Sequence, residues 1–163
     1  MIYTNGTVFA CIWWDKSESS AIIVARKTGK SAIEILGISH SAIFFDWLND
    51  LQDLDRCHNI KEAIFEFDDS VERYSQNTMV QIAKRETDIS SIRSRKGLMS
   101  QFAARTLMQR AASIDGKSCP AWLKALEMMR KSWKQGHPHP LTLCLGMALE
   151  EANCSNENWI SKI

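Results

Sequence analysis

Three short apolar runs in the first forty residues, separated by polar turns, constrain the fold of this chain more than any other feature. The runs cover residues 8–14, 20–25 and 32–38. They are rich in β-branched residues and bounded by turn residues, which favours strands over helices. We therefore predict that the chain opens with a three-stranded antiparallel meander.

The rest of the chain is expected to form helices and one further strand. Residues 61–67 predict a fourth strand, which ends in the acidic pair Asp68 and Asp69. Apolar residues recur at spacings of three and four, as on one face of a helix, in residues 42–54, 89–112, 118–136 and 141–152. Residues 71–86 are ambiguous. The predicted class is therefore α/β (α+β), with a helical C-terminal half.

Length and composition fit one globular domain. The chain has 163 residues, of which 45% are apolar and 24% charged, and this is ordinary for a domain that buries one core. We expect the domain to cover residues 1–155, with a loose tail over residues 156–163. Five cysteines, none in a Cys-x-x-Cys pair, indicate a reducing compartment such as the cytoplasm. No apolar run approaches the ~20 residues that span a bilayer.

Basic charge is concentrated in the middle of the chain. Residues 1–83 carry 7 basic and 12 acidic side chains, residues 84–134 carry 12 and 4, and residues 135–163 carry 1 and 3. A basic stretch is typical of a surface that meets nucleic acid, anionic lipid or an acidic protein, although solvated helix faces give the same pattern. An exposed tryptophan beside such charge can anchor an interface. The residues expected at an interface are Trp14, Arg93, Arg95, Lys96, Arg105 and Arg110.

Carboxylates follow two of the predicted strands. Asp15 ends the first strand, and Glu66, Asp68 and Asp69 end the fourth. Ribonuclease-H-like nucleases hold two metal ions at such strand ends, which takes three or four converging carboxylates. The last helix should then supply an acid in its first turn, but residues 139–142 are His, Pro, Leu and Thr. We therefore favour turn and cap roles for these acids, and predict no catalytic residue, metal or cofactor.

Other candidate motifs are weaker. Two Gly-Lys-Ser triplets, at residues 29–31 and 116–118, lack the glycine that a phosphate-binding loop has five positions earlier, and the first is followed by a strand and the second by a Cys-Pro break. His137, His139 and Cys144 are candidate metal ligands. They lie across a proline-broken segment, which favours a surface loop over a metal site.

The last helix carries a resemblance to a known family. Residues 139–150 read His-Pro-Leu-Thr-Leu-Cys-Leu-Gly-Met-Ala-Leu-Glu. This resembles the closing Pro-x-x-x-x-x-Gly-x-Ala-Leu helix of actin-like cytoplasmic assembly proteins of type IV pili, of the bundle-forming type, and of type II secretion systems. The predicted element order is also that of the ribonuclease-H/actin superfold. Asp15-Lys16-Ser17 lacks the glycine of an actin-type Asp-x-Gly phosphate loop, so ATP binding is not expected.

The resemblance implies a non-catalytic scaffold domain on the cytoplasmic side of the bacterial inner membrane, with a single membrane span after Ile163. The implied partners are a pilus or secretion assembly ATPase and a polytopic inner-membrane platform protein. Anionic lipid headgroups and self-association are further options, and nucleic acid is not expected. This scaffold is the function that the sequence predicts.

Two alternatives stay open. The first is a Mg²⁺-dependent, resolvase-like nuclease of the ribonuclease-H superfold, with Asp15, Glu66 and either Asp68 or Asp69 as metal ligands and the basic helices holding phosphates. The second is a DNA-binding module without catalysis.

Overall fold

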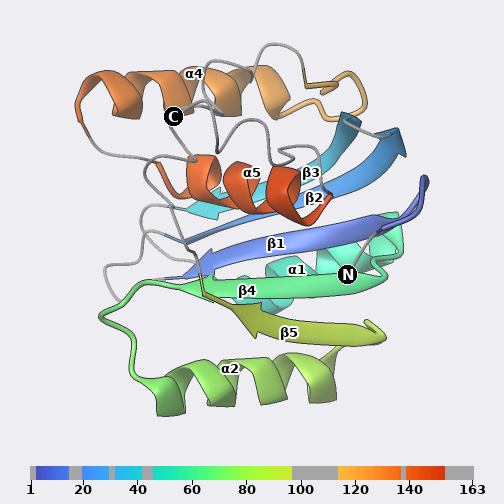
Figure 1. The fold of residues 1–163 in the computed structure, drawn as a ribbon, viewed down its shortest axis with the longest axis vertical. Coiled ribbons are helices and arrows are strands. Elements are labelled where there is room, and N and C mark those ends of the chain that lie inside the picture. The colour runs from blue at the N-terminus through green and yellow to red at the C-terminus, as the bar shows by residue number, and fades with distance from the viewer. Residues whose placement is uncertain are drawn as a thin grey trace.

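The computed structural model describes residues 3–14, 20–29, 32–41, 46–96, 114–136 and 139–152. Within these residues, five strands form one sheet and four helices pack against it (Figure 1). The elements are β1 (Val8–Trp14), β2 (Ser20–Gly29), β3 (Ala32–Ser41), α1 (Trp47–His58), β4 (Glu62–Phe67), α2 (Arg73–Glu86), β5 (Ser91–Arg95), α4 (Trp122–Lys134) and α5 (Pro140–Glu151).

The sheet is mixed, with strand order β3-β2-β1-β4-β5. β1, β2 and β3 form the predicted antiparallel meander. β4 and β5 run parallel to β1, because α1 and α2 carry the chain back between strands. The carboxyl ends of β1, β4 and β5 therefore meet at one edge of the sheet, where Trp13 is paired with Glu66 and Glu66 with Arg95.

Helices bury both faces of the sheet. Side chains alternate along β1, so that Phe9 and Cys11 contact the α4–α5 side while Ala10 and Ile12 contact the α1–α2 side. Burial on both faces explains why the strands are continuous apolar runs. α5 is buried along residues 141–149, since it lies between the sheet and α4 (Figure 1). A helix that is apolar all round is typical of such a central position.

The prediction of a helix over residues 89–112 is wrong at its start. Ser91–Arg95 is β5, which pairs with β4 and buries Ile92. Five residues with one buried apolar side chain give too short an alternation to stand out from a helical window. Residues 97–113 lie outside the described residues.

Other boundaries also differ from the prediction. The helix expected over residues 42–54 begins at Trp47 and ends at His58. Asp46 caps it, accepting a hydrogen bond from the backbone N–H of Asn49 at 3.1 Å. The ambiguous residues 71–86 contain α2. The predicted tail over residues 156–163 lies outside the described residues. No helix in the described part of the chain is long and apolar enough to cross a membrane.

Candidate functional site

A pocket of about 220 Å³ lies where β1, β4 and β5 end. Its lining includes Trp13, Glu66, Asp68, Asp69, Arg95 and Lys96. The sheet topology gathers these residues, because parallel strands place their carboxyl ends at the same edge. Three of the six are carboxylates and two are cations, so charges of both signs line this strand-end pocket.

Glu66 is the central carboxylate of the strand-end pocket. It is 3% exposed, and among the residues that the structure describes its Oε1 atom has no hydrogen-bond partner. Burial raises the pKa of this carboxyl to about 7; Arg95 opposes the shift, whereas Glu150 adds to it. A buried carboxylate oxygen without a hydrogen-bond donor is costly to the fold and marks a functional candidate.

Two arginines of β5 join Glu66 to α5. The group, which we call the arginine–glutamate cluster, consists of Arg93, Arg95, Glu62, Glu66, Glu150 and Glu151. Nε of Arg95 lies 3.3 Å from Oε1 of Glu66, and Nη1 of Arg95 lies 2.9 Å from Oε1 of Glu151. Burial alone would lower the pKa of Arg95, but bonds to Glu150 and Glu151 hold it above its usual value.

The other half of the cluster extends away from the pocket. Arg93 binds Glu62 through Nε at 2.8 Å and Glu151 through Nη2. Glu62 also accepts a hydrogen bond from the Tyr3 hydroxyl at 2.8 Å. Polar contacts thus run from the start of β4 to its end, along the face that α5 covers.

The acidic pair after β4 has a different role from Glu66. Asp68 accepts hydrogen bonds from the hydroxyl and from the backbone N–H of Ser70, the latter at 3.1 Å. These bonds lower the pKa of Asp68 and make it a turn residue. Asp69 is exposed. Asp15, the remaining predicted candidate ligand, lies outside the described residues.

The described residues do not by themselves fit the metal pair of a ribonuclease-H-like nuclease. No three His, Cys, Asp or Glu side chains in this part of the chain are close enough to hold a metal ion. The carboxylates of Glu66, Glu150 and Glu151 converge on the guanidinium of Arg95 instead. Oε1 of Glu66, which makes no hydrogen bond to the described residues, already faces a cation, the guanidinium of Arg95 at 3.3 Å.

His139 and Cys144 do not converge on a common site. His139 caps α5, with Nδ1 accepting a hydrogen bond from the backbone N–H of Leu141 at 3.1 Å. Its ring centroid lies 4.4 Å from that of His40. Burial lowers the pKa of His139 to about 4, and His40 adds to this. Cys144 is buried and donates to the carbonyl of Ala21 at 3.2 Å.

The predicted interface residues have diverse surroundings. Trp14 is half-buried and meets the ring of Phe67 edge-on, with centroids 6.4 Å apart. Arg93 and Arg95 are held in the arginine–glutamate cluster, whereas Lys96 is exposed beside the strand-end pocket. Arg105 and Arg110 lie outside the described residues, so an interface through them stays a prediction.

Sequence reasoning set aside Glu150 and Glu151, because they lie at the far end of the last helix and not in its first turn. In the structure α5 crosses the sheet, and its last turn reaches the end of β5. No local sequence signal could have placed them there, because β5 itself was not predicted.

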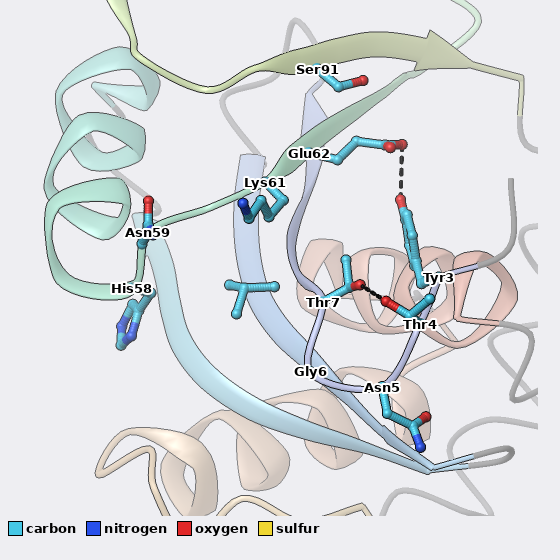
Figure 2. Close-up of a pocket in the computed structure, with 11 residues that line it drawn as sticks. Tyr3, Thr4, Asn5, Gly6, Thr7, His58, Asn59, Lys61, Glu62 and Ser91 are labelled. Carbon is cyan, nitrogen blue, oxygen red and sulfur yellow. Dashed lines mark hydrogen bonds between the residues drawn. The ribbon is translucent and has the colours of Figure 1, made fainter.

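A second pocket, of about 630 Å³, lies at the opposite end of the strands. Figure 2 shows Thr4, Thr7, Lys61 and Ser91 around it, with Tyr3 donating to Glu62 at its wall. A strand advances about 3.3 Å per residue, so the four residues from Glu62 to Glu66 separate the two pockets by roughly 13 Å. This pocket is larger but does not reach Glu66, Asp68 or Lys96.

Comparison with solved structures identifies the fold. The crystal structure of the fowlpox virus Holliday junction resolvase matches with a TM-score of 0.57 and 12% sequence identity, covering 88% of this chain and 96% of that chain. The fowlpox virus resolvase in complex with its substrate Holliday junction DNA matches with a TM-score of 0.55 and 10% identity, covering 88% and 97%.

A mutant nuclease domain of the large terminase subunit gp2 of bacterial virus Sf6, with manganese, has a TM-score of 0.49 at 14% identity, covering 90% and 89%. No protein-family model matches the chain, and no curated protein matches its sequence significantly. At these identities the resolvase likeness speaks for the fold: a mixed α/β architecture consistent with the ribonuclease-H-like class.

These comparisons correct the functional prediction. The resemblance to pilus and secretion platform proteins is wrong, because the structures that share the fold include those of a Holliday junction resolvase. The predicted non-catalytic scaffold and its ATPase and platform partners are therefore withdrawn, and the nuclease alternative is the better supported. The expectation that nucleic acid is not a partner is also wrong, because the resolvase neighbour is seen with junction DNA. The misleading signal was an apolar helix motif, which central packing alone explains.

Proposed function

We propose that this protein is a ribonuclease-H-like nuclease that acts on DNA, with branched DNA as the substrate class. The observation that carries the proposal is the fold, which matches 96% of the length of the fowlpox virus resolvase. The strand-end pocket adds support of its own, because the one carboxylate buried in it, Glu66, belongs to a strand end of the kind at which ribonuclease-H-like nucleases work.

Two cations at the pocket suit an anionic substrate, beside its three carboxylates. Arg95 and Lys96 both line it, and residues 84–134 carry a large excess of basic side chains. Lysine and arginine bind DNA phosphates and position the duplex. Fixed cations also stabilise the negative charge that develops on a phosphate during hydrolysis. In this proposal Glu66 and Asp15 act at the reacting phosphate, and Arg95 and Lys96 hold the strand.

The test is cleavage of a labelled four-way junction by the full chain, with a linear duplex of the same sequence as comparison and Mg²⁺, Mn²⁺ or EDTA present. We expect metal-dependent cleavage of the junction. Glu66→Gln and Asp15→Asn should each reduce its rate by about 100-fold or more, as loss of a group acting in the transition state does.

Asp88→Asn is the matched control. Asp88 is exposed and precedes β5, at the far end of the strands from the pocket, so its rate should equal that of the natural chain. The proposal fails if the folded protein cleaves no DNA with either metal. It also fails if both Glu66→Gln and Asp15→Asn leave the rate unchanged.

A further inference from the structure

The face of α4 that points away from the core is strongly basic. The helix buries its other face through four residues at helical spacing, Trp122, Ala125, Leu126 and Met129. Its exposed positions carry one acid, Glu127, against four cations, which gives the helix a net charge of +3. The four cations, which we call the α4 basic face, are Lys124, Arg130, Lys131 and Lys134.

Neighbouring carboxylates do not neutralise the α4 basic face. Within the described ranges, none of its four cations makes an ion pair. The helix dipole favours cations in a last turn, which accounts for Lys131 and Lys134. It does not account for Lys124, which lies in the first turn, where the dipole disfavours a cation. The face is therefore suited to an anion from outside the described chain.

α4 runs alongside β3 towards the edge at which the strand-end pocket opens. Before the helix, the hydroxyl of Ser118 donates to Glu34, near the start of β3, at 2.6 Å. After the helix, the ring of His139 packs against that of His40, near the end of β3. β3 and β1 both run antiparallel to β2, so they end at the same edge of the sheet. The last turn of α4 is therefore directed to this edge (Figure 1).

A short path along the edge joins the end of β3 to the strand-end pocket. His40, Ala21, Trp13 and Glu66 are paired in one row across β3, β2, β1 and β4. Three strand spacings of about 4.8 Å put His40 roughly 14 Å from Glu66. A base-pair step advances about 3.4 Å, so this distance corresponds to about four steps. A duplex held at the pocket therefore reaches the end of α4 within one helical turn of about 10 base pairs.

We propose that the α4 basic face binds the phosphate backbone of a DNA arm that extends from the strand-end pocket. The inference rests on the proposed function, which brings DNA to this pocket. Lysine ammonium groups are point charges that suit phosphates without reading bases. The face thus adds affinity for one arm of a branched substrate and takes no part in the chemistry at Glu66.

The experiment measures the affinity of the full chain for a labelled four-way junction by fluorescence anisotropy, with EDTA present, over a series of salt concentrations. Lys131→Gln combined with Lys134→Gln removes the two cations of the last turn. Loss of two phosphate contacts should lower the affinity by about 10-fold or more at physiological salt. The slope of log affinity against log salt should fall in magnitude by about 2. In cleavage assays, KM should rise and kcat should stay unchanged.

Lys84→Gln combined with Arg85→Gln is the matched control. These are the two cations in the last turn of α2, and both are exposed, so the changes in charge and in helix-dipole interaction are the same. α2 ends before β5 begins, at the opposite edge of the sheet. The control should keep the affinity within about twofold of the natural chain. If the α4 double variant does not fold by circular dichroism, Lys134→Gln alone should change the salt slope by about 1.

The inference is overturned if the folded α4 variant binds the junction as the natural chain does, or if the control weakens binding equally. It is also overturned if the variant keeps its DNA affinity but loses binding to vesicles of phosphatidylcholine and phosphatidylserine, which would make the face a membrane surface. These outcomes differ from failure of the proposed function. DNA binding that depends on α4 without cleavage rejects the nuclease alone, whereas cleavage with binding independent of α4 rejects this inference alone.

Discussion

Trp13 and Glu66 are paired neighbours across the parallel strands β1 and β4, at the edge where both strands end. The indole is 8% exposed and packs in the apolar cluster on the α5 side of the sheet. A large apolar ring beside a carboxylate excludes the water that would solvate its charge. The pairing therefore helps to explain why burial raises the pKa of Glu66 to about 7.

Glu66→Gln should change stability in a pH-dependent way. The Glu66 carboxyl ionises near pH 7 in the folded protein, against 4.5 for an unperturbed group, so the folded state binds this proton more tightly. The protonated Glu66 carboxyl therefore contributes about 3 kcal/mol to the unfolding free energy at low pH. This contribution is lost as pH rises from 4.5 to 7, and it is absent above pH 7. Glutamine remains neutral, and the variant should be the more stable protein at pH 8.5.

Urea unfolding of the natural chain and of Glu66→Gln at pH 4.5 and 8.5 checks this. The difference in unfolding free energy between the two proteins at each pH separates the effect of Glu66 from that of other titrating groups. The advantage of the variant should shrink to near zero at pH 4.5. An equal difference at both pH values would show that burial does not hold the Glu66 proton.

His139→Asn should alter the acid side of the stability profile. Burial lowers the pKa of His139 from 6.5 to about 4, so the unfolded chain takes up this proton first as pH falls. The unfolding free energy of the natural chain should drop as pH falls from 6.5 to 4. The drop should be about 2 kcal/mol, once solvent screening of the partly exposed ring is allowed for. Asparagine can still cap α5 but does not titrate. Parallel profiles for the two proteins, measured by thermal unfolding, would contradict this prediction.

Gly116→Ala should destabilise the fold. A Cβ atom on Gly116 would lie 2.0 Å from Cδ1 of Trp122, and this residue, the first of α4, is 5% exposed and packs in the core on the α5 side of the sheet. Overpacking of this kind costs about 1–3 kcal/mol. Gly29→Ala is the control, since among the described residues its Cβ would meet only Ala32, at an ordinary 3.7 Å. The midpoint of urea unfolding should fall for Gly116→Ala and change little for Gly29→Ala. Equal midpoints would mean that the loop moves freely away from Trp122.

Lys96→Gln should weaken DNA binding without selecting between sequences. Lys96 is exposed beside the strand-end pocket, where a phosphate contact would release about one counterion. The slope of log affinity against log salt should fall in magnitude by about 1. Lys84→Gln is the control, since Lys84 is exposed on α2, which covers the other face of the sheet. Fluorescence anisotropy in the presence of EDTA measures the DNA affinity of both variants. Identical salt slopes for the two variants would show that the DNA does not contact Lys96.

Local patterns determined much of the fold. The runs that became β1, β2 and β3 were recognisable because both faces of the sheet are buried, which makes each strand almost wholly apolar. The same holds for β4 and for α5, whose apolar residues 141–149 lie between α4 and the sheet. In each case the apolar pattern that predicts the element lies within a dozen consecutive residues, because burial of those side chains stabilises the element.

Tertiary structure decided the rest, because the remaining signals join residues far apart in the chain. β5 has five residues and becomes a strand by pairing with β4. Glu66 and Glu150 come together through Arg95, from three elements whose packing no local pattern encodes. The sequence alone could propose Glu66 as a catalytic acid, but it could not show that an arginine from an unpredicted strand meets it. That contact depends on the pairing of β5 with β4, and the further contacts of Arg95 with Glu150 and Glu151 depend on how α5 crosses the sheet.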